Sequence, residues 1–203
     1  MISQRPFVSC MAGIVLILNG TTCSVDRSER ESFKVASSAY AILAEKSLDV
    51  MADFDLETWD TMLSDSVVYY VPDRNEKTNN KLTGKSALLA WWSNYIAVSG
   101  IKSMTIENAH YVPICSEKKG KKGELPGIQV IAYFSNNMIY EKGSVSVRMK
   151  FIIHFDENKM IDGYYTYYDA SPIVKMQKDK NIAGKLTPDF RLKLNTLLPE
   201  YNI

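Results

Sequence analysis

The second half of the chain is dominated by long segments with the residue pattern of β-strands. They are rich in β-branched and aromatic residues, and turn residues such as Glu141-Lys142-Gly143 separate them. Strands that follow one another through short turns pair antiparallel. This pattern predicts a large antiparallel sheet, with strands at 102–115, 127–140, 144–155 and 160–169.

The first half of the chain has the periodicity of amphipathic helices. Ser28 and Glu31 form a capping box, and apolar residues at three- and four-residue spacings predict a long helix over 29–52. Asp55 is a good N-cap for a second, short helix. A strand at 67–71, a polar loop at 74–82 and a third helix capped near Thr83 or Ser86 complete this half. We therefore expect an α+β domain with three N-terminal helices at 24–171.

The first 22 residues have the layout of a secretory signal peptide. Arg5 precedes an apolar run at 11–18, and small polar residues lead to Cys23. A signal of the lipoprotein type would leave Cys23 as the lipidation site; plain secretion and a short buried helix are the alternatives. The expected location is outside the cytoplasm, as a periplasmic or outer-membrane-anchored lipoprotein or as a secreted protein.

Charge and ligand-type residues restrict the possible partners. The net charge is +1, so the chain has no field that would attract nucleic acid, and contact with a membrane is expected only through a lipid on Cys23. The only histidines, His110 and His154, are isolated, so we expect no metal site. We also expect no cofactor, because the proton-transfer chemistry considered below needs none. The tail at 172–203 is a C-terminal extension with a short helix expected at 189–198.

The last hairpin predicts which side chains face inward. A loop at 156–159 would place Phe155 opposite Met160, and opposite residues share one face of a sheet. The inner face then contains Phe151, Tyr164 and Tyr168, while His154 faces outward. A slip by one residue would exchange the two faces, so this assignment depends on the register.

Asp162 is the only carboxylate on the inner face that this register defines. A carboxylate there either finds hydrogen-bond donors or rises in pKa by desolvation, and both suit acid–base chemistry. Tyr164 on the same face offers a hydroxyl. We therefore name Asp162 and Tyr164 as candidate catalytic residues; the alternative is that Asp162 lies wet at the rim of the sheet.

The order of these segments resembles the nuclear transport factor 2-like superfamily and, within it, the secreted SnoaL-like and ketosteroid isomerase-like bacterial proteins. Asn158 replaces the glycine that usually precedes Lys159. The matching segments are Asp55-Leu56 before Trp59, Asp65 before Val67-Val68, Gly84-Lys85 before Trp91-Trp92, and Lys159-Met160-Ile161 before Tyr168-Asp169.

The resemblance implies a cystatin-like α+β cone: a curved, mostly antiparallel sheet wrapped around the helices, with an apolar cavity. Catalytic members usually hold Asp, His or Tyr in that cavity, which matches the expected position of Asp162. They include cyclases, isomerases and dehydratases, and the fold alone does not choose among them.

Our leading hypothesis is an exported domain that binds a small apolar or aromatic molecule. It could catalyse proton transfer next to a carbonyl, with Asp162 as base and a tyrosine polarising the oxygen. The alternative is a non-catalytic, homodimeric association module, in which these aromatic residues are core. The expected lining residues are Trp59, Tyr69, Trp91, Trp92, Tyr95, Tyr133, Phe151 and Tyr168.

Overall fold

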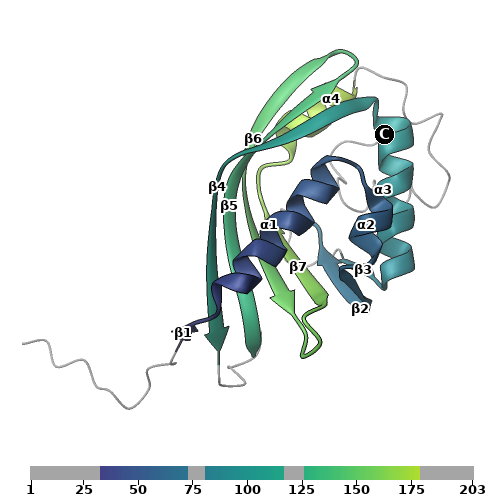
Figure 1. Cartoon of the computed structure of the whole chain (residues 1–203). Helices are drawn as coiled ribbons and strands as arrows, with labels where there is room; N and C mark the ends of the chain where they lie inside the picture. Colours follow the sequence, from purple (N-terminus) through teal and green to yellow (C-terminus); the bar gives the residue numbers. More distant parts are fainter. Residues whose placement is uncertain (1–32, 73–80, 117–125, 179–203) are drawn as a thin grey trace, which may run out of the picture. The chain divides into compact units, whose positions relative to one another are not determined.

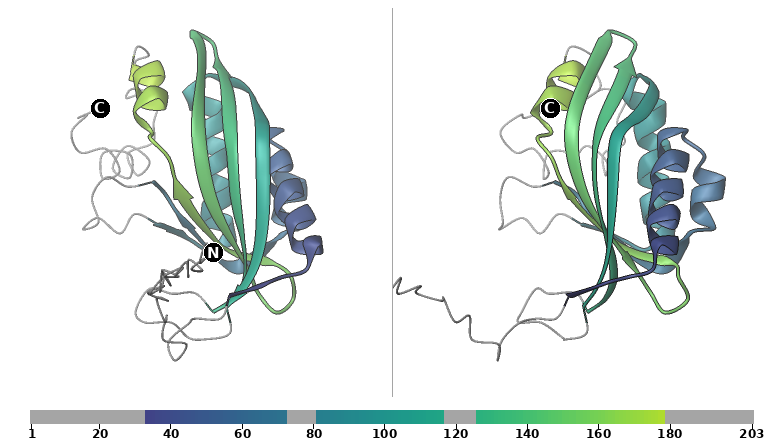
Figure 2. Two further views of the ribbon diagram at one scale, coloured as in Figure 1. Left: turned by 90° about the vertical axis from the view of Figure 1, so that its left-hand side faces the viewer. Right: turned by 60° about the vertical axis from the view of Figure 1, so that its left-hand side comes forward.

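The computed structural model describes residues 33–72, 81–116 and 126–178. They form one curved sheet with helices against its concave face, as Figures 1 and 2 show. The sheet has seven strands in the order β1-β4-β5-β6-β7-β2-β3. All neighbours pair antiparallel except β2 and β7, which are parallel, so the sheet is mixed. The α+β class is confirmed.

The long strands lie where the sequence pattern predicts them. The strands are β1 (Phe33–Val35), β2 (Leu63–Tyr70), β3 (Lys81–Thr83), β4 (Ile101–Ser116), β5 (Gly127–Tyr140), β6 (Gly143–Phe155) and β7 (Ile161–Tyr167). Along β5 and β6 buried and more accessible residues alternate over most of their length, which is the period of a sheet with one covered face.

Four helices are described: α1 (Ser38–Ala52), α2 (Leu56–Asp60), α3 (Lys85–Ser99) and α4 (Ser171–Lys178). Asp55 caps α2 as predicted, because its carboxylate accepts a hydrogen bond from the Thr58 backbone at 2.9 Å. Within the described ranges, no helix has the length and apolar content needed to cross a membrane.

Two predicted helix starts are wrong. Helix α1 begins only at Ser38, after the N-cap Ser37, and residues 33–35 pair with the end of β4 instead. The N-cap of α3 is Gly84, whose φ of 90° favours glycine, and not Thr83 or Ser86. Residues 81–83 belong to the edge strand β3. The predicted signal peptide, Cys23 and the helix at 189–198 lie outside the described residues.

The hairpin between β6 and β7 does not have the predicted register. The Asp156 carboxylate accepts hydrogen bonds from the Asn158 and Met160 backbones, and Asp156 N–H bonds the Met160 carbonyl at 2.9 Å. The loop is therefore one residue shorter than predicted. A bulge at Asp162 adds a second shift, so that Ile153 pairs with Tyr164 instead of Asp162.

Together the two single-residue shifts move the pairing by two residues. Because side chains alternate between the two faces of a sheet, the residues beyond the bulge lie on the predicted faces. Tyr164 and Thr166 are buried on the inner face, as predicted. Before the bulge the prediction is reversed, because Ile161 is buried and Asp162 stands with His154 on the other side. Gly163 allows this bulge, since a Cβ there would lie 3.1 Å from the Tyr165 ring.

Tyr164 is the centre of a buried polar network that joins the helices to the sheet. Trp59 Nε1 donates to its hydroxyl at 2.9 Å, and the Ser47 hydroxyl lies 3.0 Å from it. All three residues are completely buried. Burial raises the pKa of Tyr164 to about 12, so the hydroxyl stays protonated at neutral pH. Residues of α1, α2 and β7 are thereby held together.

We predict that Tyr164→Phe lowers the free energy of unfolding by about 1–3 kcal/mol, because the buried Trp59 N–H loses its acceptor. Urea unfolding measures this change. Tyr167→Phe is the matched control on the same strand: it is half exposed and should change stability by less than about 0.5 kcal/mol. Equal effects of the two substitutions would contradict the role of the network.

Candidate functional site

A cavity of about 100 Å³ lies between the inner face of the sheet and helix α3. Its walls come from far-apart segments, since α1, α3, α4 and five strands or their flanking residues all contribute. The lining residues are Met51, Tyr69, Val71, Pro72, Trp91, Trp92, Tyr95, Met104, Asn136, Met138, Met149, Phe151, Tyr168, Ala170 and Ile173. This composition is typical of sites for small apolar ligands.

Aromatic rings from helix α3 and from the sheet line the cavity. On α3, Trp91 and Tyr95 stack with their ring centroids 5.5 Å apart, and Trp92 meets Trp91 edge to face at 5.4 Å. From the sheet, Phe151 stacks on Tyr168 at 6.3 Å. These contacts fix the orientation of the rings, because each prefers offset or edge-to-face geometry. A flat apolar group in the cavity would contact ring faces and ring edges.

Four methionines, Met51, Met104, Met138 and Met149, complete the apolar lining. Met104 and Met138 are directly paired across β4 and β5. Unbranched thioether side chains adapt to irregular shapes and make favourable contacts with aromatic rings. The cavity therefore combines rigid rings with adaptable methionines. Such a lining can adjust to the shape of a rigid ligand.

Asn136 Oδ1 and Trp92 Nε1 are buried polar atoms of the cavity lining that have no hydrogen-bond partner among the described residues. Asn136 is only 4% exposed. Its Nδ2 faces the Met104 sulfur at 3.7 Å, a weak acceptor. Buried polar groups in folded proteins are nearly always paired, so these two atoms need an explanation.

The tyrosine hydroxyls of the cavity are donors and not bases. Burial raises the pKa of Tyr168 well above its usual range, with the neighbouring Tyr140 adding to the effect. Burial also raises the pKa of Tyr69. Tyr95 and Tyr140 share a hydrogen bond of 2.7 Å between their hydroxyls. In the described lining there is no carboxylate, imidazole or thiol.

A second hollow lies outside, where the parallel strands β2 and β7 end. It shares Val71, Pro72 and Tyr168 with the cavity, so the same residues border both spaces. Its remaining lining is Tyr70, Tyr165, Thr166 and Tyr167. The rings of Tyr70 and Tyr165 stack at 4.6 Å and form a flat wall. The shared residues give the cavity a border with the protein surface.

Most of the predicted lining is brought together, and some of it is not. Tyr69, Trp91, Trp92, Tyr95, Phe151 and Tyr168 line the cavity. Tyr133 does not: it is 49% exposed and pairs with Lys150 on the outer face. Trp59 and Tyr164 are completely buried in the polar network beside the cavity, where they are core residues.

Asp162 lies outside the cavity. Its carboxylate contacts His154 Nδ1, and His154 Nε2 lies 2.8 Å from the Pro126 carbonyl oxygen. Both ring nitrogens therefore face acceptors, and the imidazole bridges β7 to the start of β5. The predicted inward position of Asp162 is wrong because the bulge turns it to the side of His154. The hypothesis that Asp162 acts as a base required its carboxylate to face the cavity, and it does not.

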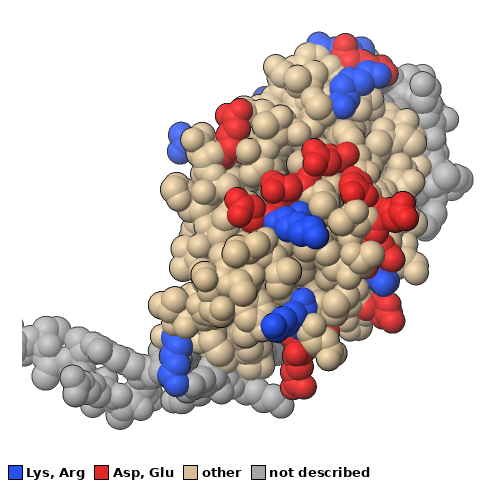
Figure 3. All heavy atoms as spheres, viewed as in Figure 1, with Lys and Arg blue, Asp and Glu red and all other residues tan. Residues whose placement is uncertain are grey.

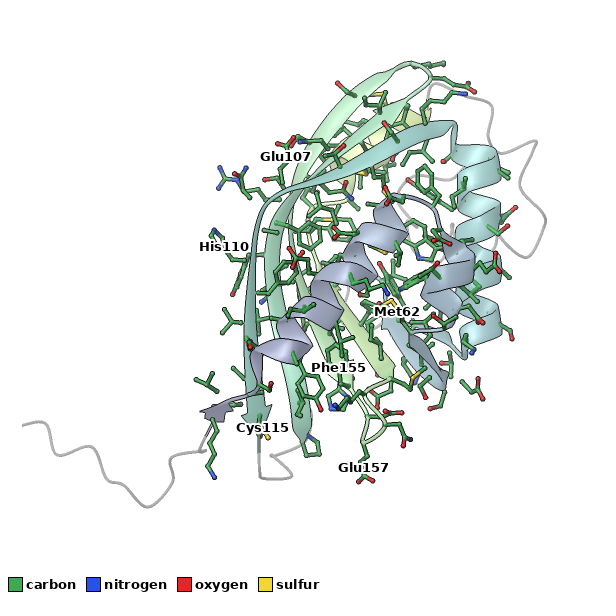
Figure 4. All side chains as sticks on the ribbon, in the orientation of Figure 1. Met62, Glu107, His110, Cys115, Phe155 and Glu157 are labelled. Carbon is green, nitrogen blue, oxygen red and sulfur yellow. The ribbon has the colours of Figure 1, made fainter. Side chains whose placement is uncertain are left out.

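The other acidic residues and the histidines of the described ranges are also absent from the cavity lining. In Figure 3 acidic side chains gather on the helical side of the molecule. Among the acidic residues of α1, Asp49 has a raised pKa because of partial burial and, secondarily, of Glu45 and Asp53. Figure 4 shows His110 pointing away from the helices. No group of three or more His, Cys, Asp or Glu residues within the described ranges could hold a metal ion.

Comparisons with known proteins agree with this architecture. No protein family and no curated protein matches the sequence. An NTF2-like protein from Burkholderia xenovorans LB400 is 10% identical, with a TM-score of 0.50 over 71% of this chain and 99% of that one. The chain has the nuclear transport factor 2-like fold. At this identity the likeness extends to the fold and not to the activity.

Two other solved structures share this nuclear transport factor 2-like fold. PrhC from Penicillium brasilianum NBRC 6234 is 11% identical, with a TM-score of 0.54 over 78% of this chain and 95% of that one. An LEH-like epoxide hydrolase from M. tuberculosis is 15% identical, with a TM-score of 0.50 over 73% of this chain and 96% of that one.

Asn136 and the four methionines of the cavity were not predicted from the sequence as site residues. A signal for Asn136 existed, because it stands at an inward position of β5 between the apolar Phe134 and Met138. Alternation along that strand predicts an apolar residue there. A polar residue at such a position has either a buried partner or a ligand.

Proposed function

We propose that this protein binds a small, largely apolar molecule in the cavity between the sheet and α3. One observation carries the proposal: a cavity with rigid aromatic and adaptable methionine walls that borders the surface through Val71, Pro72 and Tyr168. Close-packed cores leave few voids larger than a water molecule. A cavity of about 100 Å³ is therefore larger than close packing normally leaves, and a bound ligand would explain it.

The size of the cavity sets the size of the buried group. An apolar cavity of about 150 Å³ in another protein binds benzene. A space of about 100 Å³, with methionines that can shift, suits a single aromatic ring or a group of similar volume. A larger ligand would extend past Tyr168 into the outer hollow.

The proposed role is binding, without proton transfer by Asp162. An acid or base must lie within hydrogen-bond reach of the proton that it transfers. The cavity lining offers only protonated tyrosine hydroxyls, Asn136 and indole N–H groups among its described polar groups. These groups orient a ligand or polarise an oxygen. The LEH-like epoxide hydrolase among the structural neighbours acts on a small molecule, which supports the general class of ligand.

Toluene is a suitable probe, since it is a single apolar ring. We expect calorimetric titration to show binding, and Ala170→Trp to weaken it about tenfold or more, because the added indole fills the border of the cavity. Lys175→Trp, on the exposed side of α4, is the control and should leave the affinity unchanged. Asp162→Asn should also leave it unchanged. Absence of binding of both toluene and phenol, the same ring with a hydroxyl group, to the wild-type protein would refute the proposal.

A homodimer through the outer face of the sheet is the second candidate function. On this face a row of apolar and aromatic side chains crosses five strands. Each residue of the row is directly paired with the next one on the neighbouring strand. The residues are Val112, Ile131, Ile152, Tyr165 and Tyr70. Val112 is 47% exposed. A continuous apolar row on an open sheet face is typical of an interface.

We predict that the wild-type protein sediments as a dimer at micromolar concentration and that Ile152→Lys makes it a monomer, because a desolvated charge opposes association. Ile42→Lys, on an exposed position of α1, should leave the dimer intact. Sedimentation velocity distinguishes the species. A monomeric wild-type protein would exclude this assembly.

We also propose that the protein is exported, on the basis of the sequence pattern of residues 1–23. Sequencing the mature N-terminus and mass spectrometry of Cys23 would distinguish secretion from lipid anchoring.

A further inference from the structure

We infer that the cavity selects ligands that carry a hydrogen-bond donor, and that Asn136 makes this selection. The inference rests on the proposed binding function and goes beyond it, because the aromatic and methionine walls by themselves would accept any apolar ring. The specificity comes instead from one polar side chain that packing alone does not explain.

Asn136 has an apolar environment in the sheet. Its direct partners are Ile106 on β4 and Val147 on β6. Its neighbours of the same strand face, Phe134 and Met138, are buried. An amide in such surroundings loses its contacts with water and regains only those that the protein or a ligand supplies.

The amide is oriented by the sulfur of Met104. A thioether accepts hydrogen bonds and donates none, so the NH₂ group faces the Met104 sulfur at 3.7 Å. This orientation leaves Asn136 Oδ1 as the unpaired atom, and no described group donates to it. Asn136 therefore lacks a hydrogen-bond donor for its side-chain oxygen.

A hydroxyl group on the ligand would donate the missing hydrogen bond to Asn136 Oδ1. It donates one hydrogen bond and can also accept, and the second unpaired atom of the wall, Trp92 Nε1, is a donor. A site with buried polar groups rejects an analogue that leaves those groups unpaired. The cavity should therefore prefer a hydroxylated ring to a ring of the same size whose oxygen only accepts.

Phenol, anisole and toluene test the inference at pH 7, since they share one ring and differ in hydrogen bonding. Phenol both donates and accepts, anisole only accepts, and toluene does neither. Calorimetric titration of the wild-type protein should show that phenol binds about tenfold more tightly than anisole, the effect of one additional buried hydrogen bond. Equal affinities for phenol and anisole would overturn the inference.

Asn136→Leu is the decisive variant, and Asn137→Leu is its matched control. Asn137 is the next residue of β5 and faces the other side of the sheet. Asn136→Leu should abolish the preference for phenol, retain binding of toluene and raise the melting temperature, because it removes an unpaired buried acceptor. Asn137→Leu should keep the preference. A purely structural Asn136 would instead give a lower melting temperature on substitution and an unchanged preference.

The outcomes separate the two proposals. Binding of toluene without a preference for phenol would leave the binding function intact and refute the role of Asn136. If none of the three probes binds, the proposed binding function itself fails. Should Asn136→Leu not fold, the wild-type comparison of phenol and anisole still decides.

Discussion

The packing of helices against a curved sheet depends on the hydroxyl of Tyr164. This one oxygen connects Ser47 on α1 and Trp59 on α2 to strand β7. The network lies in the closed part of the interior, and the cavity lies beside it. A buried polar network that is fully paired specifies one arrangement of its surroundings. The position of α1 and α2 on the sheet is fixed there, which leaves the neighbouring space under α3 free for a ligand.

The bulge at Asp162 is the second constraint, and it separates structural from ligand-facing groups. It turns Asp162 to the outer side, where His154 bridges it to Pro126, and it keeps Tyr164 on the inner side. The His154–Asp162 pair is thereby part of the scaffold and does not face the cavity. What faces the cavity is apolar, apart from a few groups that donate or accept single hydrogen bonds.

Much of the fold follows from the sequence because its signals are local. The alternation along β5 and β6 and the N-cap of α2 at Asp55 require no knowledge of distant residues. The hairpin register could not be predicted in the same way, since it depends on two single-residue shifts: the tighter loop formed by the Asp156 carboxylate and the bulge at Asp162. Both arise from side-chain hydrogen bonds and close contacts that periodicity does not contain.

The candidate site shows the same division. The aromatic lining from α3 is predictable, because Trp91, Trp92 and Tyr95 form a helical stripe. Trp59 and Tyr69 carry equally strong aromatic signals, yet only Tyr69 lines the cavity. Which aromatic residue fills the core and which borders a space depends on the packing of the whole domain. Asn136 was overlooked since a single polar residue in an apolar strand has no motif.

The central claim is that a small apolar ring occupies this cavity. The most direct test is NMR of the protein labelled with ¹³C at its methionine methyl groups, titrated with toluene. We expect shifts and contacts with toluene protons at Met51, Met104, Met138 and Met149, and none at Met160, which lies at the β6–β7 hairpin outside the lining. Unchanged cavity methionines, or equal shifts at Met160, would contradict the account.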